Sequence, residues 1–486
     1  MMGPVRPSLR RFVLLSLVLV VGSACREDVR DDGEGPLAID PYLTGLGSDS
    51  AVLNWRTTLA VESRISYGLT FDFELGTIKL GAGMQQQVEL SGLSPGTRYH
   101  YEVNNQVRGT FRTAAADESL RFAVLGHTHG TENPGHYPDE WLAERIRELH
   151  PRFVIHAGDA TYHATVGDFS QYFFKPFSDL LSSTPVYLAP GNHDAGWPFI
   201  HGENLSVFKE LFPYSYAPGQ SENDQAHYAL SQGNTLFLVL SYTSEIGPGS
   251  AQRAWIEQQI KESDHEFHAL VYGGVGGYFD SGSLLDFAVE LGVDWILNGD
   301  GDQEPIFRRH KGMPVFFTGS STGRPHVFLL CDAREYFVEF QALDASGGFR
   351  DKWWIHSKRE IPSAYEMEPF RIVKIGRTHK YRFKFDPPVA MSRVGGLQMK
   401  VSPQVANGRL VLVYITPDAA VQGERGYRTQ SVMVGPEDAM ITTSLPGVDP
   451  FTGEPFAMRE LLVQFGPLQD GEDIIVEGFH LFEPRK

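Results

Sequence analysis

Two stretches, RFVIHAGDATY (residues 152–162) and PVYLAPGNHD (residues 185–194), decide the fold of this 486-residue chain. In each, an apolar run of strand length leads into a short polar loop. Between residues 120 and 344 further apolar runs alternate with amphipathic segments such as EWLAERIRELH (residues 140–150), which is typical of α/β domains. We therefore expect a central α/β domain over residues 118–345. Because such domains place ligand groups at the ends of their strands, we expect a site in these loops.

Strand-like patterns flank the central domain on both sides. Residues 36–115 hold short alternating runs such as AVLNWRT and RYHYEV, separated by turn residues, which predicts an N-terminal β-sandwich. Strand-like runs such as YRFKF and RLVLVYI dominate residues 353–486, which predicts an all-β, jelly-roll-like C-terminal domain. The chain is too long for one hydrophobic core, so a multidomain protein is expected.

The first residues have the pattern of an export signal. Three arginines precede the apolar run over residues 12–21, which is too short to span a bilayer, and small residues follow up to Cys25. This junction resembles a bacterial lipobox, which implies cleavage after residues 1–24 and a lipid on Cys25, with residues 25–35 forming an anchored, charged tether. We expect an exported lipoprotein of the bacterial cell envelope, held to its membrane by the lipid alone. Cleavage by an ordinary signal peptidase, which would release a soluble protein, is the alternative.

The charge balance argues against one class of partner. The chain has 60 Asp and Glu against 42 Lys and Arg, which gives a formal net charge of −18 with histidine neutral. A surface of this average sign repels the phosphate backbone of nucleic acids. We therefore expect no nucleic-acid partner.

The two strand-end loops, in this order and spacing, resemble the GDxxY and GNH[DE] motifs of purple acid phosphatases, a branch of the calcineurin-like metallophosphoesterases. The motifs read GDATY at residues 158–162 and GNHD at residues 191–194, and residues 227–259 are similar to a further family segment. Residues 36–115 resemble the fibronectin type III module that precedes the catalytic domain in large members. Phosphatases of the alkaline D type share this layout, but the two motifs fit the purple acid branch better.

The resemblance implies a role for each matching residue. Asp159 would bridge two metal ions, Tyr162 would be a phenolate ligand, and Asn192 would bind the second metal. His193 would be the acid or base beside the scissile phosphate. The alternatives are turn formation for Asp159 and Asn192, and a partly buried structural side chain for Tyr162 and His193.

Three other loops depart from the family pattern at four positions. His127, in the loop GHTH, stands where the family has aspartate, and Gly274 stands where it has a metal-binding histidine. Asp300 and Asp302 replace the two imidazoles of the family's Gly-His-x-His motif. Carboxylate and imidazole can both bind a metal ion, so three of the four changed positions keep a metal-competent side chain.

These substitutions have two interpretations. In the first, a mixed shell binds one Fe, Mn or Zn ion rather than two. Its candidate ligands are His127, His129, Asp159, Tyr162, Asn192, Asp300 and Asp302. A metal-bound hydroxide would then hydrolyse a phosphomonoester or diester, with His193 assisting the leaving group. In the second, the residues drifted after catalysis was lost, and the chain is a surface module that binds a glycan, a phosphorylated polymer or a protein.

Overall fold

The structure is a computed structural model of the whole chain. It describes residues 36–115, 120–129, 140–196, 205–217, 226–242, 246–274, 283–299, 307–318, 326–334, 337–344, 348–357, 363–367, 370–373, 380–401, 409–417, 427–434, 440–445, 457–466 and 473–482. The predicted export signal, Cys25 and the tether lie outside these residues, as do Asp300 and Asp302. Within the described ranges, no helix combines the length and the apolar character needed to cross a membrane.

The N-terminal unit is all-β. Its strands are β1 (Leu37–Leu46), β2 (Ser50–Gly68), β3 (Gly76–Ser91), β4 (Arg98–Val103) and β5 (Val107–Arg112). The long strand β2 pairs with β1 through its first half and with β4 through its second, and its register with β3 is interrupted between Arg56 and Val61. Trp55, Tyr101 and Phe111 form part of the buried core. The finer resemblance to a fibronectin type III module stays a prediction.

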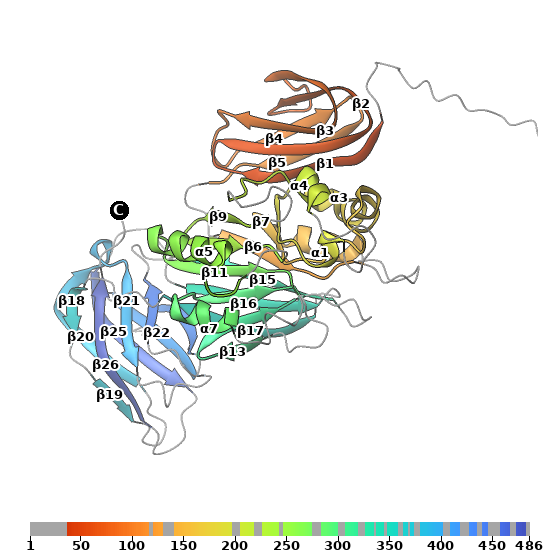
Figure 1. Cartoon of the computed structure of the whole chain (residues 1–486). Helices are drawn as coiled ribbons and strands as arrows, with labels where there is room; N and C mark the ends of the chain where they lie inside the picture. Colours follow the sequence, from red (N-terminus) through yellow and green to blue (C-terminus); the bar gives the residue numbers. More distant parts are fainter. Residues whose placement is uncertain are drawn as a thin grey trace, which may run out of the picture.

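Two six-stranded sheets form the centre of the molecule (Figure 1). The first contains, in spatial order, β17 (Phe349–His356), β16 (Phe337–Asp344), β15 (Val327–Ala333), β6 (Leu120–Leu125), β7 (Phe153–His156) and β8 (Val186–Leu188). The second contains β13 (Phe307–His310), β14 (Met313–Phe317), β12 (Trp295–Asn298), β11 (Phe267–Tyr272), β10 (Thr235–Val239) and β9 (Tyr228–Gln232). Neighbours β6, β7 and β8 are parallel, as are β10, β11 and β12, because helical connections return the chain to the same edge. Strand β14 is also parallel to β12.

Helices cover the outer faces of the two sheets. The described helices of the central unit are α1 (Glu140–Glu148), α2 (Val166–Asp168), the π-helix η1 (Phe169–Phe174), α3 (Lys175–Leu181), α4 (Ser206–Leu211), α5 (Ala251–Glu262) and α7 (Ser283–Glu290), together with the 3₁₀-helix η2 (His193–Ala195) in the loop after β8. Helices α1, α3 and α4 share a core with β6 and β8, whereas α5 and α7 share another with β10 to β12. A third core, with Phe122, Phe237 and Trp295, fills the space between the sheets. The strands buried on both faces explain why their sequences are continuous apolar runs.

The two sheets converge at their carboxyl ends, where glycines allow the backbones to touch. A Cβ atom on Gly126, after β6, would lie 2.5 Å from Cα of Gly299, after β12. A Cβ atom on Gly158, after β7, would lie 2.4 Å from Cα of Gly273, after β11. Because no side chain fits at either point, glycine is required for this approach. The convergence brings loops from both sheets to one place.

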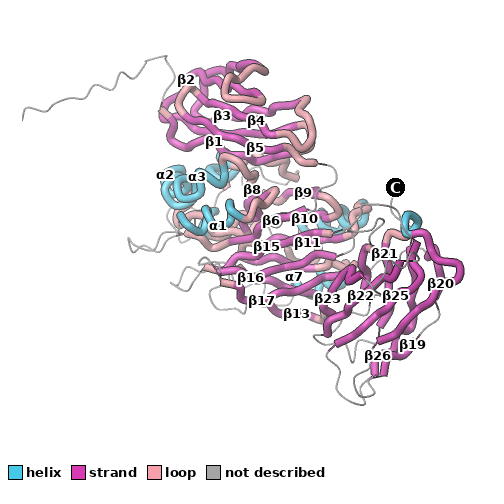
Figure 2. Tube along the Cα trace, turned by 180° about the vertical axis from the view of Figure 1, so that it is seen from behind, coloured by secondary structure: helices cyan, strands magenta, loops and turns pink. Residues whose placement is uncertain are grey.

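The C-terminal unit consists of two antiparallel sheets around one hydrophobic core (Figure 2). Its elements are β18 (Ser363–Met367), β19 (Phe370–Val373), β20 (Lys380–Ala390), η3 (Met391–Arg393), β21 (Gly396–Val401), β22 (Arg409–Pro417), β23 (Tyr427–Val434), β24 (Met440–Ser444), β25 (Ala457–Gly466) and β26 (Asp473–Phe482). Strand β17 pairs with β16, so the central sheet extends beyond residue 345, where the sequence predicted its end. The jelly-roll-like topology stays a prediction.

The N-terminal unit is packed firmly on the central one. The side chain of Tyr42 belongs to the core around α3 and donates a hydrogen bond to the carbonyl of Leu211. The Tyr101 hydroxyl donates to the carbonyl of Ser182 at 2.8 Å, and Arg56 forms an ion pair with Glu210. These contacts hold strands β1 and β4 against the helices of the central unit.

Candidate metal centre

The loops after β6 and β7 are tied together through their backbones. The N–H of His127 donates to the carbonyl of Gly158 at 2.8 Å, and the N–H of His129 donates to the carbonyl of Asp159 at 3.1 Å. His127 and Asp159 both have left-handed backbone conformations, with φ of 51° and 58°. Non-glycine residues rarely adopt this conformation, and such strain is concentrated at functional sites. The strained backbone fixes where these two side chains lie.

Three of the predicted ligands come together. His127, His129 and Asp159 each offer a donor atom, and these atoms all lie within 4.8 Å of one another. All three residues are buried, and the two imidazole rings have centroids 4.5 Å apart. Two imidazoles and a carboxylate in one buried group can bind Fe, Mn or Zn. The cluster could therefore hold a metal ion.

The loop after β8 adds Asn192 and His193 to this group. The N–H of His193 donates to Oδ1 of Asp159 at 3.1 Å, which places the third loop against the second. Asn192 is buried, and its Oδ1 atom has no hydrogen-bond partner among the described residues. A buried amide oxygen without a partner is costly, and an amide oxygen is also a common metal ligand. The donor set at this edge of the first sheet therefore fits a metal ion.

The side chain of His193 has a defined orientation. Its Nδ1 atom lies 3.0 Å from the carbonyl of Tyr162, and since a carbonyl only accepts, Nδ1 carries a proton. Its ring packs against those of His129 and Tyr162, with centroids 4.3 and 4.8 Å away. With Nδ1 engaged, Nε2 is the atom that can exchange a proton. This geometry suits the acid or base role predicted for His193.

Asp194, the last residue of the GNHD loop, connects the loop after β8 to the loop after β7. Its carboxylate accepts four backbone N–H groups, from Asp159, Ala160, Thr161 and Gly191, at 2.7 to 3.2 Å. Burial raises the pKa of Asp194 to about 6, while the four amides favour the ionised form. The carboxylate is therefore ionised at neutral pH. Sequence reasoning missed this positioning role, although the acidic residue is part of the quoted motif.

Gly191 is needed for the same junction. A Cβ atom at this position would lie 2.1 Å from Oδ1 of Asp159 and 2.6 Å from the Asp159 backbone nitrogen. Any side chain at position 191 would therefore displace the carboxylate predicted to bridge the metals.

His156, at the end of β7, is a second residue that sequence reasoning missed. It is fully buried, its Nε2 atom bonds to Thr128 Oγ1 at 2.8 Å, and burial lowers its pKa to about 3.

At the end of β11, the second sheet presents a glycine packed against two tyrosines. Gly274, at the position of the expected histidine, follows β11, and its carbonyl accepts a hydrogen bond of 3.3 Å from the Asn298 side chain. A Cβ atom on Gly274 would lie 2.5 Å from the Tyr272 hydroxyl and 2.6 Å from Cδ2 of Tyr242. Two tyrosines therefore occupy the space that a side chain at position 274 would need. Asp300 and Asp302 follow β12 but lie outside the described residues.

Comparison with known proteins agrees with this geometry. The family model described as calcineurin-like phosphoesterase matches residues 120–300. This part of the chain is a calcineurin-like metallophosphoesterase domain. The chain is similar to a probable purple acid phosphatase 20 of Arabidopsis thaliana, with 21% identity over 243 residues, which are 46% of this chain and 55% of the relative. It thus spans about half the length of that relative.

Solved structures share the fold of this chain over about two thirds of its length. Purple acid phosphatase PPD1 from yellow lupin (Lupinus luteus) seeds superimposes with a TM-score of 0.50 and 16% identity, over 66% of this chain and 74% of that one. The structure of PhoD gives a TM-score of 0.50 and 14% identity, over 67% of this chain and 91% of that one. The two TM-scores are equal, so the fold likeness favours neither of these two structures.

The predicted ligands of the metallophosphoesterase site thus fall into three groups. His127, His129 and Asp159 form the cluster. Tyr162 and Asn192 lie on the loops beside it, and the Tyr162 ring is 5.4 Å from that of His129. The positions of Asp300 and Asp302 are not among those described, and their part in binding stays a prediction.

Proposed function

We propose that the chain is a phosphoester hydrolase with a rearranged metal site that holds one metal ion. The observation that carries this proposal is the buried group of His127, His129 and Asp159, whose donor atoms lie within 4.8 Å of one another. Asn192 is the fourth candidate ligand, since its buried Oδ1 atom has no hydrogen-bond partner among the described residues. A metal ion in such a site polarises a phosphoryl oxygen and makes water a nucleophile at neutral pH.

The residues of the chain then have separate tasks. Asp159 would hold the ion. Two hydrogen bonds keep Asp159 in place: its own N–H donates to the Asp194 carboxylate, and its carboxylate accepts the N–H of His193. His193 donates a proton from Nε2 to the leaving oxygen of a phosphomonoester or diester, since its Nδ1 is held by the Tyr162 carbonyl. Tyr162 packs against the imidazole rings of His129 and His193.

A single ion is supported by the second sheet. In purple acid phosphatases two ions share the site, and by the resemblance the family has a histidine at the position that Gly274 takes in this chain. Here the tyrosine contacts around Gly274 fill that space. One ion instead of two removes the clamp on both the attacking and the leaving oxygen, so we expect slow turnover.

Metal content and activity, measured together, test this proposal. The purified chain is offered Fe, Mn and Zn, its metal content is measured by elemental mass spectrometry, and hydrolysis of p-nitrophenyl phosphate and its diester is followed. We expect about one ion per chain and slow hydrolysis, both lost in Asp159→Ala. His193→Ala should keep the ion and lower hydrolysis by about a hundredfold, the usual size of general acid catalysis. Two ions per chain would contradict the mononuclear site.

A binding module without catalysis is the second candidate function. It is supported by the glycine and tyrosine packing after β11, which leaves the second half of the site without the expected imidazole. This candidate predicts that the chain binds no metal ion, or binds one and hydrolyses neither ester. If the chain binds Fe, Mn or Zn but hydrolyses neither ester with any of them, the binding module is favoured over the hydrolase.

We also propose that the chain is exported and anchored by a lipid on Cys25. The support is the sequence pattern of basic, apolar and small residues before this cysteine. Mass spectrometry of the N-terminal peptide from bacterial membranes should detect acyl groups on Cys25, and Cys25→Ser should release the protein from the membrane fraction. An unmodified cysteine at the mature N-terminus would disprove the anchor.

A further inference from the structure

Two buried histidines outside the metal cluster flank the loop of residues 126–129, which carries His127 and His129. His156 is the last residue of β7, and His326 directly precedes β15. Strands β7 and β15 are the two neighbours of β6 in the first sheet, and the first residues of β15 lie beside the end of β6 because these two strands are antiparallel. The two imidazoles therefore reach the loop after β6 from opposite sides.

Each histidine is hydrogen-bonded to a different part of this loop. The Nε2 atom of His156 lies 2.8 Å from Oγ1 of Thr128, the residue between the two candidate ligands. The Nε2 atom of His326 lies 3.1 Å from the carbonyl oxygen of Gly126, and since a carbonyl only accepts, this nitrogen carries a proton and donates the bond. One imidazole thus fixes a side chain of the loop, and the other fixes its backbone.

The loop needs such contacts because its backbone is strained. His127 has a left-handed conformation with φ of 51°, which is unfavourable for a non-glycine residue and persists only where the surroundings enforce it. The N–H groups of His127 and His129 donate to the carbonyls of Gly158 and Asp159, which tie the loop to the loop after β7. His326 adds a bond on the side of β15. The strained segment is therefore held from both neighbouring strands.

Hydrogen bonding, more than filling of space, distinguishes His156 from an apolar residue. Its ring lies against Phe173 in an edge-to-face arrangement, with centroids 5.4 Å apart. A phenylalanine at position 156 could make the same ring contact, but it could not bond to the Thr128 hydroxyl. The specific contribution of the imidazole is therefore to orient Thr128, and through it the residues on either side.

We propose that His156 and His326 are positioning residues for the metal centre, which hold His127 and His129 in the direction of Asp159. The inference rests on the metal site proposed above and adds to it two residues that do not bind the ion. Neither of them belongs to the group whose donor atoms lie within 4.8 Å of one another. Residues that hold metal ligands fix the orientation of those ligands, and their loss typically weakens metal binding by about 10- to 100-fold.

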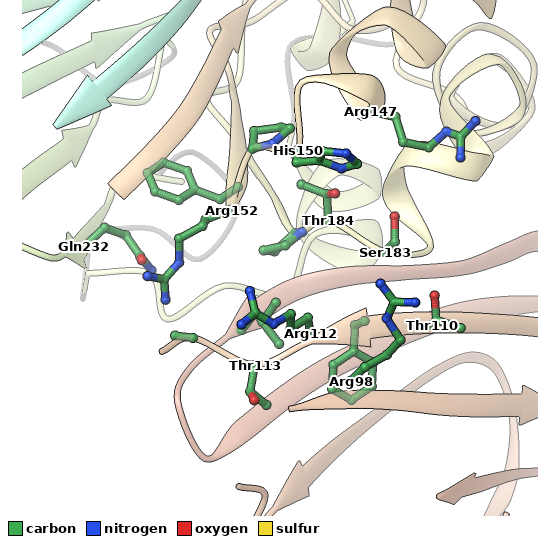
Figure 3. A pocket seen from close by; sticks show the side chains of 16 residues that line it. Arg98, Thr110, Arg112, Thr113, Arg147, His150, Arg152, Ser183, Thr184 and Gln232 are labelled. Carbon is green, nitrogen blue, oxygen red and sulfur yellow. The ribbon is translucent and has the colours of Figure 1, made fainter. Parts of the chain in front are cut away.

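The other end of β7 offers a control. Figure 3 shows His150, Arg152 and Thr184 at the cavity between the N-terminal sandwich and the central unit. His150 is exposed and precedes β7, whereas His156 ends this strand, whose four residues span roughly 13 Å. Loss of the His150 imidazole should therefore leave metal binding unchanged. Asparagine is the suitable replacement, because it tolerates the left-handed backbone of this position, where φ is 52°.

The zinc affinity of the full chain tests the proposal, by calorimetry on metal-free protein. We expect His156→Phe and His326→Phe each to bind Zn²⁺ at least about tenfold more weakly than the wild type. His156→Gln and His326→Gln should recover part of this loss, since the glutamine amide can take the place of Nε2. His150→Asn should bind Zn²⁺ like the wild type. Circular dichroism checks that each variant is folded.

A double-mutant cycle shows whether His156 acts through Thr128. Thr128→Val removes the hydroxyl and nearly keeps the shape of the side chain, so it should weaken Zn²⁺ binding about as much as His156→Phe. If their hydrogen bond carries the effect, the double variant should bind no more weakly than either single variant. Additive losses, or wild-type zinc affinity in the two phenylalanine variants, would overturn the proposal.

Hydrogen exchange on the metal-free chain separates this proposal from the metal site itself. Backbone N–H groups of residues 126–129 should exchange faster in His156→Phe and His326→Phe than in the wild type, and at the wild-type rate in His150→Asn. A wild type that binds no Zn²⁺ would contradict the proposed metal site, and the exchange rates would then decide the positioning role alone. Exchange at the wild-type rate in both phenylalanine variants would show that neither histidine holds the loop.

Discussion

The two halves of the candidate metal centre are built in different ways. After β6, β7 and β8, buried polar side chains fill the space, and His127, His129 and Asp159 meet there. After β11 and β12, the described residues are glycines whose backbone touches the first sheet, and the side chains of Tyr272 and Tyr242 lie against Gly274. The sheets are thus joined by backbone contacts that need no metal ligand. This difference teaches that one half of such a site can change its ligands while the strand ends keep their positions.

The largest effect is expected from Asp194→Ala, in the first half. Four buried backbone N–H groups would lose their acceptor, so the free energy of unfolding should fall by about 3 to 5 kcal/mol. Because Asp194 joins the loops that carry Asp159 and His193, its removal should also lower metal affinity by about 10- to 100-fold. Denaturant unfolding and metal titration measure the two effects.

Asp294→Ala is the matched control for this variant in the second sheet. Asp294 is also buried, and its carboxylate accepts the N–H of His268 at 2.9 Å. Its removal should lower stability and leave the metal affinity unchanged. If both variants weakened metal binding equally, Asp194 would have no specific part in positioning the ligands.

Gly191→Ala is expected to have the next largest effect. The added methyl group would meet the Asp159 carboxylate, so this side chain must move or the loops must separate. We expect a loss of about 3 kcal/mol in stability, as for an overpacked core, together with weaker metal binding. Gly247→Ala, where a Cβ atom would meet nothing within 4 Å, should change neither property. Unchanged metal affinity in Gly191→Ala would show that metal binding does not require the Asp159 carboxylate in its present position.

Gly274→His asks whether the second half can be restored. Because a Cβ atom at this position would meet Tyr272 and Tyr242, we expect a loss of about 2 kcal/mol in stability and no additional metal ion. Gly274→Ala should be destabilised to a similar extent, since the methyl group already makes these contacts. A second ion per chain in the histidine variant, measured by elemental mass spectrometry, would remove the distinction between the two halves.

The last effect, which is absent at neutral pH, concerns acid stability near the second sheet. His227, which directly precedes β9, is buried with its ring 4.6 Å from that of Trp255. Burial, aided by the charge of Lys209, lowers the pKa of His227 to about 4. Since this is below the ordinary value of 6.5, its contribution to stability is present at neutral pH and is lost as the pH falls from about 6.5 toward 4. His227→Phe should make the melting temperature less sensitive to pH in this range. An unchanged pH dependence would mean that this imidazole does not limit acid stability.

Much of the central fold and half of the site follow from local sequence patterns. Continuous apolar runs alternating with amphipathic segments predict the α/β centre, because strands buried on both faces and one-sided helices leave different periodicities. The polar loops after β6, β7 and β8 are visible for the same reason, since each interrupts an apolar run. The resemblance of these loops to purple acid phosphatase motifs implies His127, His129 and Asp159 among seven candidate ligands of one metal, and these three residues lie together in the structure.

Other features were decided only by the tertiary structure. The bonds from the Asp159 loop to Asp194, the glycine contacts between the sheets and the contact of Tyr242 with Gly274 all join residues that are distant in the chain. The extension of the central sheet through β17 is of the same kind, because strand pairing depends on a partner that periodicity cannot identify. A sequence pattern reports how each segment divides its own surface between core and solvent. It does not report which other segment completes that core or that site.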